Sequence, residues 1–184
     1  FLPLHEIANI LRDTKVAVGA QNVSWTPAGA YTGAVSAYLV KGSGCQYALV
    51  GHSERRYIFN EHDDDVRKKV EACLAVGITP VVCVGETRED LDAGKRQYRL
   101  KKQLMSVFQG LSLRGGRAIV AYEPVWAIAN GGAGTPCLPA DADDVQGWIK
   151  QELLQYTGDT VPVLYGGSVD VKNVVSYLSR ETID

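Results

Sequence analysis

The chain has 184 residues, and its 19 Lys and Arg side chains nearly balance its 21 Asp and Glu side chains, giving a formal net charge of −2. No block of one charge sign is long enough to attract nucleic acid or an anionic membrane, and the apolar runs are too short to span a bilayer. Composition therefore excludes a nucleic-acid-binding tail and a membrane-embedded chain, and it indicates one soluble globular domain over residues 1–184.

Five apolar runs rich in β-branched residues predict strands, at 16–19, 47–50, 80–84, 118–122 and 161–165. A short amphipathic helix is expected at 3–12, and further helices around 28–39, 65–76, 96–109, 141–156 and 171–178. Strand starts recur at roughly the spacing of a βαβ unit, so the class is α/β with a parallel sheet covered by helices. An open doubly wound sheet and a barrel both fit, and the lack of a G-x-G-x-x-G or Walker motif favours the barrel.

The cysteines and histidines indicate which environment and which metals to expect. The four cysteines, at 45, 73, 83 and 137, form no C-x-x-C pair, and there is no signal-peptide pattern. This predicts reduced thiols in the cytoplasm. The three histidines lack the i,i+4 spacing of a metal site, so we expect no metal and interpret the acidic run 61–65 as a solvated helix start.

Polar and glycine residues gather directly after each predicted strand. They occupy positions 21–22, 51–54, 85–86, 123 and 166–168. Because the carboxyl ends of parallel strands share one face, five separate loops should point at a common pocket.

The stretch 118–136 joins a buried strand to a loop of unusual composition. The strand ends in an acid, Glu123, followed by the rigid Pro124, and the loop carries the apolar anchors Trp126 and Ile128 before a glycine-rich run at 131–134. Apolar anchors with permissive residues between them are typical of a moving lid. The alternative is an ordinary glycine-rich surface loop.

Two further motifs supply polar groups at the same face. His52 comes immediately before Ser-Glu, a pairing typical of a first helical turn, and a helix N-terminus would keep the imidazole neutral and able to donate to a carbonyl. The alternative is a histidine that only caps and packs. The segment 165–169 (YGGSV) offers unobstructed backbone amides and a hydroxyl ahead of a helix expected near Asp170, which indicates a phosphate cradle, although a Gly-Gly turn alone is weak evidence.

These segments resemble the signature motifs of the triosephosphate isomerase family, in the family's order. The resemblance rests on 122–128 (YEPVWAI), 51–56 (GHSERR) and 165–169, and the segments 18–22 and 80–86 with Gly33 agree with it. It implies a (β/α)₈ TIM barrel, incomplete here, in which this chain holds strands three to seven with their helices. The family's first strand with its Asn-x-Lys motif, the second strand, and the eighth with its phosphate-binding Gly-Gly have no counterpart. We therefore expect a piece of a longer protein with little or no turnover by itself.

The resemblance also implies a reaction, the interconversion of dihydroxyacetone phosphate and D-glyceraldehyde 3-phosphate in glycolysis and gluconeogenesis. Glu123 would remove the proton next to the carbonyl, and neutral His52 would polarise the oxygens of the enediol(ate), an effect for which this family is itself the standard example. No metal or organic cofactor is implied.

The remaining site residues are likewise taken from the resemblance. Phosphate contacts would come from Ser168, the Gly166-Gly167 pair and the backbone of Ala129. Tyr122, Trp126 and Glu86 would rearrange as the lid shuts, and Tyr165 would latch it. Ser53 and Glu54 would support the floor of the site, and Cys83 would pack behind the base or serve only as a small buried residue.

Two departures from the family pattern qualify these expectations. Ala129 and Asn130 stand where the family's lid usually has Gly-Thr, so altered lid kinetics are expected. The loop 21–33, with Thr32, resembles the segment through which one subunit reaches its neighbour, which predicts a homodimer, but Ala34 replaces a common acid. Two other functions stay open: a related isomerase acting on a four-carbon ketose phosphate, and a non-catalytic phosphate-binding relative.

Overall fold

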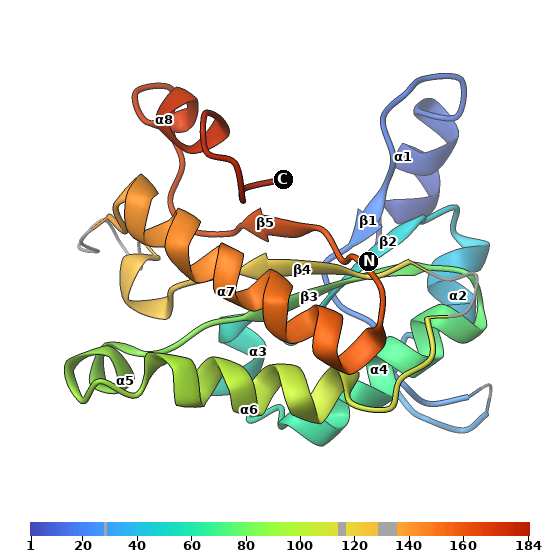
Figure 1. Cartoon of the computed structure of the whole chain (residues 1–184). Helices are drawn as coiled ribbons and strands as arrows, with labels where there is room; N and C mark the ends of the chain where they lie inside the picture. Colours follow the sequence, from blue (N-terminus) through green and yellow to red (C-terminus); the bar gives the residue numbers. More distant parts are fainter. Residues whose placement is uncertain (28, 114–116, 129–135) are drawn as a thin grey trace.

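A parallel five-stranded sheet forms the centre of the protein, in a computed structural model that describes residues 1–27, 29–113, 117–128 and 136–184 (Figure 1). The strands are β1 (Gly19–Ala20), β2 (Tyr47–Val50), β3 (Thr79–Val84), β4 (Ile119–Tyr122) and β5 (Val163–Tyr165). In the register, Val50 lies opposite Val82, and Val84 lies opposite Tyr122.

The order of the strands in the sheet distinguishes the two candidate architectures. It runs β1-β2-β3-β4-β5, so every strand pairs only with its neighbours in the sequence. A doubly wound sheet reverses its order at a switch point, whereas the strands of a barrel follow the chain. The sheet therefore has the topology of a (β/α)₈ barrel and contains five of its strands.

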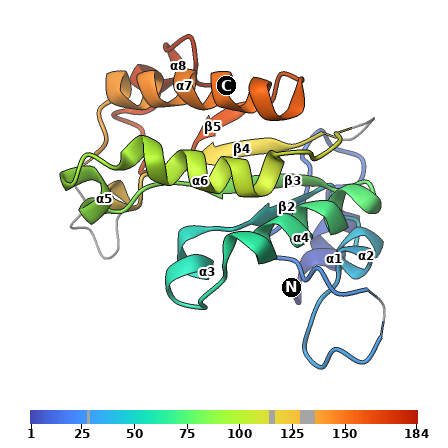
Figure 2. The same ribbon diagram turned by 60° about the horizontal axis from the view of Figure 1, so that its bottom comes forward.

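Three long helices cover one face of this sheet. They are α4 (Asp63–Ala75), α6 (Arg96–Phe108) and α7 (Pro139–Thr157), which lie side by side in Figures 1 and 2, while α1 (Leu4–Ile10) and α8 (Val174–Leu178) lie at opposite ends of the sheet. Strand residues that face these helices, such as Val50, Val82 and Val120, are fully buried. The alternate residues, such as Leu49 and Val81, are only half-buried, so the opposite face is the one that a closed barrel would enclose.

Most predicted elements are confirmed to within two residues, and three differ by more. The helix expected at 171–178 begins only at Val174, as α8. The helix expected at 28–39 is wrong, because α2 (Ala37–Gly42) begins only after Ser36, whose Oγ accepts the Leu39 N–H at 3.3 Å. The first strand is shorter and later than the expected 16–19. Two short helices, α3 (Ser53–Tyr57) and α5 (Arg88–Asp92), follow β2 and β3. In the ranges that the structure describes, no helix has both the length and the apolar character needed to cross a membrane.

Candidate active site

Glu123 is the first residue after β4 and lies at the carboxyl edge of the sheet. Its side chain is only 5 % exposed, and its carboxylate accepts the Ser53 N–H at 3.0 Å and the Ser53 hydroxyl at 3.1 Å. The His52 Nε2 atom lies 2.7 Å from Glu123 Oε1. Burial raises the pKa of the Glu123 carboxyl above its ordinary value, although His52 and Ser53 oppose the shift. The carboxylate is therefore a stronger base than an exposed glutamate.

His52 occupies the N-cap position of α3, as its position before Ser-Glu predicts. Its Nδ1 accepts the backbone N–H of Glu54 at 3.2 Å. An imidazole nitrogen that accepts a hydrogen bond carries no proton, so we assign the proton of the neutral ring to Nε2 from these partners. His52 thus caps the helix through one nitrogen and presents an N–H donor to the site through the other. The capping interpretation is confirmed, and donation to a substrate carbonyl remains a prediction.

The ends of β3 and β4 approach each other closely beside Glu123. The Glu123 N–H donates to the carbonyl of Val84 at 2.8 Å, and a Cβ placed on Gly85 would lie 1.8 Å from the carbonyl oxygen of Glu123. On the other side, the side-chain amide of Gln103 accepts from the Gly85 N–H at 2.9 Å and donates to its carbonyl at 3.2 Å. Glycine is therefore required at position 85, between the side-chain amide of Gln103 and the backbone of Glu123. Cys83, two residues before Gly85, is buried, and this burial together with the Glu123 charge raises the pKa of its thiol to about 12.

Glu86 joins the aromatic residues on the two sides of Glu123. Its carboxylate accepts the Tyr122 hydroxyl at 3.1 Å and the Trp126 indole N–H at 2.7 Å. Glu86 is fully buried, and its backbone carbonyl accepts the N–H of Val125 at 3.1 Å. The structure therefore brings together the three residues that were predicted as one group. Their rearrangement remains a prediction.

The segment after β5 supplies fewer free amides than the sequence indicates. The Gly166 N–H donates to the Tyr122 carbonyl at 2.7 Å, so this amide is already engaged, and α8 begins at Val174 rather than near Asp170. Within the described ranges, the N–H groups of Gly167 and Ser168 donate to no protein acceptor. The prediction is corrected in two respects, because the Gly166 amide is not free and no helix starts directly after the segment. Phosphate binding by the other two amides remains a prediction.

The predicted lid residues lie partly outside the described ranges. Ala129 and the glycine run 131–134 belong to that part, so the predicted contact from Ala129 is not tested. Before it, Ser168 Oγ donates to the Ala127 carbonyl at 3.0 Å, which places the β5 loop against the start of the lid. The Tyr165 ring stacks on Tyr177 at 4.4 Å, and its latching role remains a prediction.

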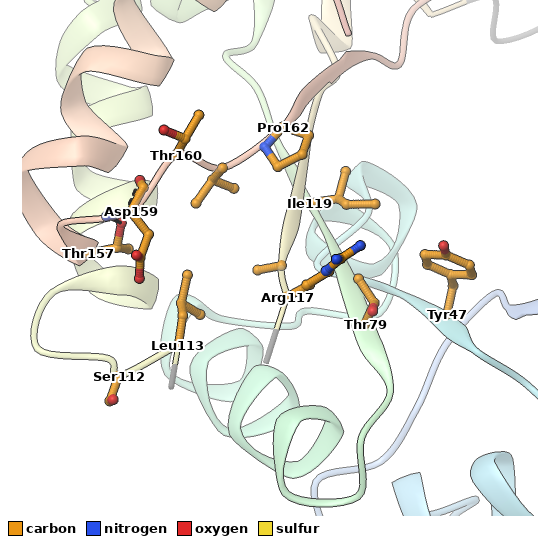
Figure 3. Close-up of a pocket in the computed structure, with 12 residues that line it drawn as sticks. Tyr47, Thr79, Ser112, Leu113, Arg117, Ile119, Thr157, Asp159, Thr160 and Pro162 are labelled. Atoms are coloured by element: carbon orange, nitrogen blue, oxygen red, sulfur yellow. Dashed lines mark hydrogen bonds between the residues drawn. The ribbon is translucent and has the colours of Figure 1, made fainter. Parts of the chain in front are cut away.

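Cavities occur at both ends of the strands. A cavity of about 770 Å³ lies at the amino ends, where Tyr47, Thr79 and Ile119 begin β2, β3 and β4 (Figure 3). A smaller one of about 290 Å³ lies at the carboxyl end, bordered by Ser53 and Trp126. Sites in parallel α/β folds are built at the carboxyl ends, so the larger cavity is not where the chemistry gathers.

Glu61, the first residue of the acidic run 61–65, is not part of a solvated helix start as predicted. Glu61 is buried and paired with Arg55 Nε at 3.0 Å and with the ammonium of Lys69. Lys69 Nζ also donates to Asn22 Oδ1 at 2.8 Å, which fixes the loop after β1. Only Asp63 to Asp65 form the expected acidic first turn of α4. In the part of the chain that the structure describes, no cluster of three or more His, Cys, Asp or Glu residues could hold a metal ion.

Comparison with known proteins now decides the family. A family profile described as triosephosphate isomerase matches residues 1–184. The chain belongs to the triosephosphate isomerase family. The triosephosphate isomerase of Roseiflexus sp. (strain RS-1) is 41 % identical over 189 aligned residues, which cover 100 % of this chain and 73 % of the relative, and that of Aquifex aeolicus (strain VF5) is 39 % identical with 100 % and 74 % covered. The crystal structure of the Bartonella henselae triosephosphate isomerase superposes with a TM-score of 0.87 at 34 % identity, covering 98 % of this chain and 73 % of that one.

Membership of the triosephosphate isomerase family confirms the predicted barrel and isomerase class, but some residues of the site carry no motif signal. The sequence motifs did not indicate Arg96, which contacts Glu86, or Asp141, which contacts Arg96. Arg99, which also carries no motif signal, binds the Asp90 carboxylate through two nitrogens. A useful signal would have been a glutamate in the loop just after a strand, followed by an arginine at the start of the second helix along the chain.

Proposed function

We propose that this protein interconverts dihydroxyacetone phosphate and D-glyceraldehyde 3-phosphate through an enediol(ate), with Glu123 as the base and His52 as the hydrogen-bond donor. The observation that carries the proposal is the 2.7 Å approach of the donor Nε2 of His52 to the Glu123 carboxylate at one rim of the sheet. A base and a neutral donor that touch each other can reach two adjacent atoms of one small substrate.

In the proposed first step, a Glu123 oxygen takes the proton from the carbon next to the carbonyl. The electrons of the broken C–H bond form the carbon–carbon double bond, and negative charge develops on the former carbonyl oxygen. The Nε2–H of His52 donates to that oxygen and stabilises the charge. The proton of the adjacent hydroxyl then moves to the former carbonyl oxygen, so the negative charge passes to the other oxygen. Glu123 returns its proton to the former carbonyl carbon, and the adjacent carbon now carries the carbonyl, which completes the isomerisation.

The hydrogen bonds from Ser53 define the resting position of the base. Three donors contact its two oxygens, and the Nε2–H of His52 cannot donate to Glu123 and to the substrate oxygen at the same time, so at least the His52 bond must break during catalysis. We propose that substrate binding replaces this bond and draws the carboxylate away from Ser53. Glu54 supports the site indirectly, because its backbone N–H fixes the tautomer of His52.

For the phosphate, we propose the amides of Gly167 and Ser168, with Ala129 contributing from the lid and Tyr165 latching it. The support is that the two amides have no protein acceptor in the described ranges and adjoin the start of the lid through the Ser168–Ala127 hydrogen bond. Successive backbone N–H groups in a turn can form an anion-binding concavity.

We also propose that the protein is a cytoplasmic homodimer that associates through the loop 21–33. The loop carries the exposed Tyr31, Thr32 and Trp25, and the ammonium of Lys68 lies 4.9 Å from the centre of the Trp25 ring. Aromatic residues on an exposed loop are typical of protein interfaces. The four buried cysteine thiols support a reducing environment.

The test of the reaction uses Glu123→Asp, Glu123→Gln and His52→Gln in the intact protein, with the exposed Glu71→Gln as the control. We expect losses in kcat of about 100-fold or more for the three site variants and no loss for the control. In D₂O, wild-type enzyme should place solvent deuterium on the carbon next to the carbonyl, and Glu123→Gln should not. Equal deuterium exchange in the two proteins would refute the role of Glu123. A four-carbon ketose phosphate assayed in parallel would identify the alternative substrate.

A further inference from the structure

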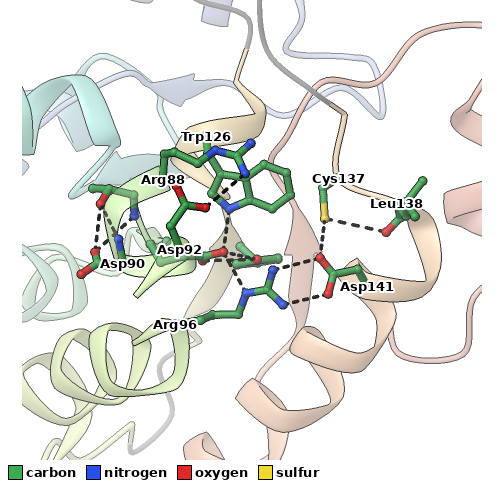
Figure 4. Close-up of polar contacts among 12 residues, drawn as sticks. Arg88, Asp90, Asp92, Arg96, Trp126, Cys137, Leu138 and Asp141 are labelled. Carbon is green, nitrogen blue, oxygen red and sulfur yellow. Dashed lines mark hydrogen bonds and ion pairs between the residues drawn. The ribbon is translucent and has the colours of Figure 1, made fainter. Parts of the chain in front are cut away.

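The guanidinium of Arg96 lies between two carboxylates that belong to different parts of the chain. Arg96 begins α6, and its Nε donates to Glu86 Oε1 at 3.0 Å. Its two terminal nitrogens donate to the two oxygens of Asp141, in the first turn of α7, at 2.7 and 3.0 Å (Figure 4). Such two-pronged contacts fix the orientation of a planar guanidinium as well as its position.

Glu86 in turn holds the backbone on both sides of the proposed base. Tyr122, one residue before Glu123, donates its hydroxyl to the Glu86 carboxylate, and Trp126 donates its indole N–H to the same group. The Glu86 carbonyl accepts the Val125 N–H. A change in the place of Glu86 would therefore move the residues on each side of Glu123.

A carboxylate with no exposed surface needs a cation to remain in place. Glu86 is 0 % exposed, and Arg96 supplies that cation while remaining 21 % exposed. Although burial opposes its charge, the hydrogen bonds to Asp141 and the neighbouring acids raise the pKa of Arg96 above its ordinary value, so it stays charged. Asp141 accepts a further contact from the Cys137 thiol at 3.6 Å, which ties the network to the chain just before α7.

We infer that Arg96 is a positioning residue for the isomerisation, which aims the Glu123 carboxylate by holding Glu86 against the fixed carboxylate of Asp141. Arg96 does not contact Glu123 or the proposed substrate position, and it acts through Glu86 and the two aromatic residues. This inference rests on the proposed function, because it assigns a role in the same reaction. The simpler reading is that Arg96 and Asp141 only join α6 to α7.

The structure provides a matched control for that simpler reading. Arg99 lies three residues further along the same helix and also binds one carboxylate through two nitrogens, to Asp90 at 2.8 and 3.2 Å. It connects α6 to α5 and has no part in the contacts of Glu86. Arg99→Gln therefore removes an ion pair of the same kind from the same helix without disturbing Glu86.

The experiment compares Arg96→Gln, Arg96→Lys, Asp141→Asn and Arg99→Gln in the intact protein. We expect Arg96→Gln to lower kcat by about 10- to 100-fold with KM changed by no more than about threefold, because the base is misaligned while substrate binding is kept. Arg96→Lys should recover part of kcat, Asp141→Asn should lose less than Arg96→Gln, and Arg99→Gln should keep wild-type kcat even where unfolding shows a similar loss of stability.

A second measurement needs no turnover. The indole N–H proton resonance of Trp126, with that of Trp25 as the internal reference, should shift in Arg96→Gln and stay in place in Arg99→Gln. Wild-type kcat in Arg96→Gln, or an equal loss in Arg99→Gln, would overturn the inference while leaving the proposed reaction intact. If Arg96→Gln does not fold, a wild-type kcat in both Arg96→Lys and Asp141→Asn would overturn it as well. Failure of the proposed function would instead appear as an inactive wild-type protein, and the Trp126 resonance would still test the network.

Discussion

Substitution of Gly85 by alanine is the sharpest test of how the fold places the base. The new Cβ would lie 1.8 Å from the Glu123 carbonyl oxygen and 2.7 Å from its carbonyl carbon, whereas real Cβ atoms essentially never come closer than 3.0 Å to another heavy atom. Going from 1.8 to 3.0 Å requires a displacement of about 1.2 Å. The two hydrogen bonds from Gln103 hold Gly85 from behind, so much of this displacement must fall on Glu123.

Gly85→Ala should lower both the stability and the reaction rate, through two separate effects. Forcing one extra methyl group into a closely packed contact costs about 1–3 kcal/mol of stability. A shift of about 1 Å in a catalytic group can lower the rate by about 100-fold even when the chemistry of the group is intact. We therefore expect Gly85→Ala to lose stability in that range and to lose kcat by about 10- to 100-fold.

Urea unfolding and steady-state kinetics of the intact protein measure both effects, with Gly42→Ala as the control. Gly42 ends α2, has no neighbour within 4 Å of a built Cβ and does not need a left-handed backbone, so alanine there should be neutral or slightly stabilising. If Gly85→Ala unfolds at the wild-type urea concentration and keeps kcat within about twofold, the close approach of β3 and β4 does not set the position of the base.

Three further predictions concern charge and hydrogen bonding. Burial raises the pKa of Glu123 in the folded protein, so its contribution to stability is fully present below the pKa of the unfolded chain and is lost as the pH rises through the raised pKa. In urea titrations from about pH 4 to 8, the unfolding free energy of Glu123→Gln should therefore increase relative to that of the wild type as the pH rises. A difference in unfolding free energy that does not change with pH would contradict the raised pKa. Lys69→Met should lower the unfolding free energy by about 3 kcal/mol or more, because it removes a cation from the buried Glu61 carboxylate, and Lys69→Arg should lower it less. Equal unfolding free energies of Lys69→Met and the wild type would show that the ion pair is dispensable. Tyr177→Phe removes a hydrogen bond to the Cys137 carbonyl and should cost about 1 kcal/mol in thermal unfolding, so an unchanged melting temperature would argue against that bond.

The sheet and its long helices could be predicted because their patterns are continuous. The runs at 47–50, 80–84 and 118–122 match β2, β3 and β4 to within one residue, since strands buried in a parallel sheet are apolar throughout. The segment 28–39 failed because apolar residues at helical spacing also occur in an exposed loop. There, Ser24 pairs with Ser36 in an isolated bridge, and the cap at Ser36 delays the helix.

In the candidate site, too, some contacts could be predicted from the sequence and others depend on the three-dimensional arrangement. Glu123, His52 and Ser53 could be predicted to meet because each follows a strand whose carboxyl end shares one rim. The engagement of the Gly166 amide could not, because it depends on the register that sets Tyr165 opposite Tyr122. The pairing of Arg96 with Asp141 could not be predicted either, because many other acidic residues on neighbouring helices could equally pair with an arginine.

The sequential strand order has a consequence for how the protein acquires its structure. Each strand finds its partner in the βα unit next to it, so the sheet can grow along the chain at one edge without rearranging strands already joined. During synthesis, the unit that holds His52 should be ordered before the unit that holds Glu123 leaves the ribosome, and docking of β4 onto β3 would then bring the two proposed catalytic residues together.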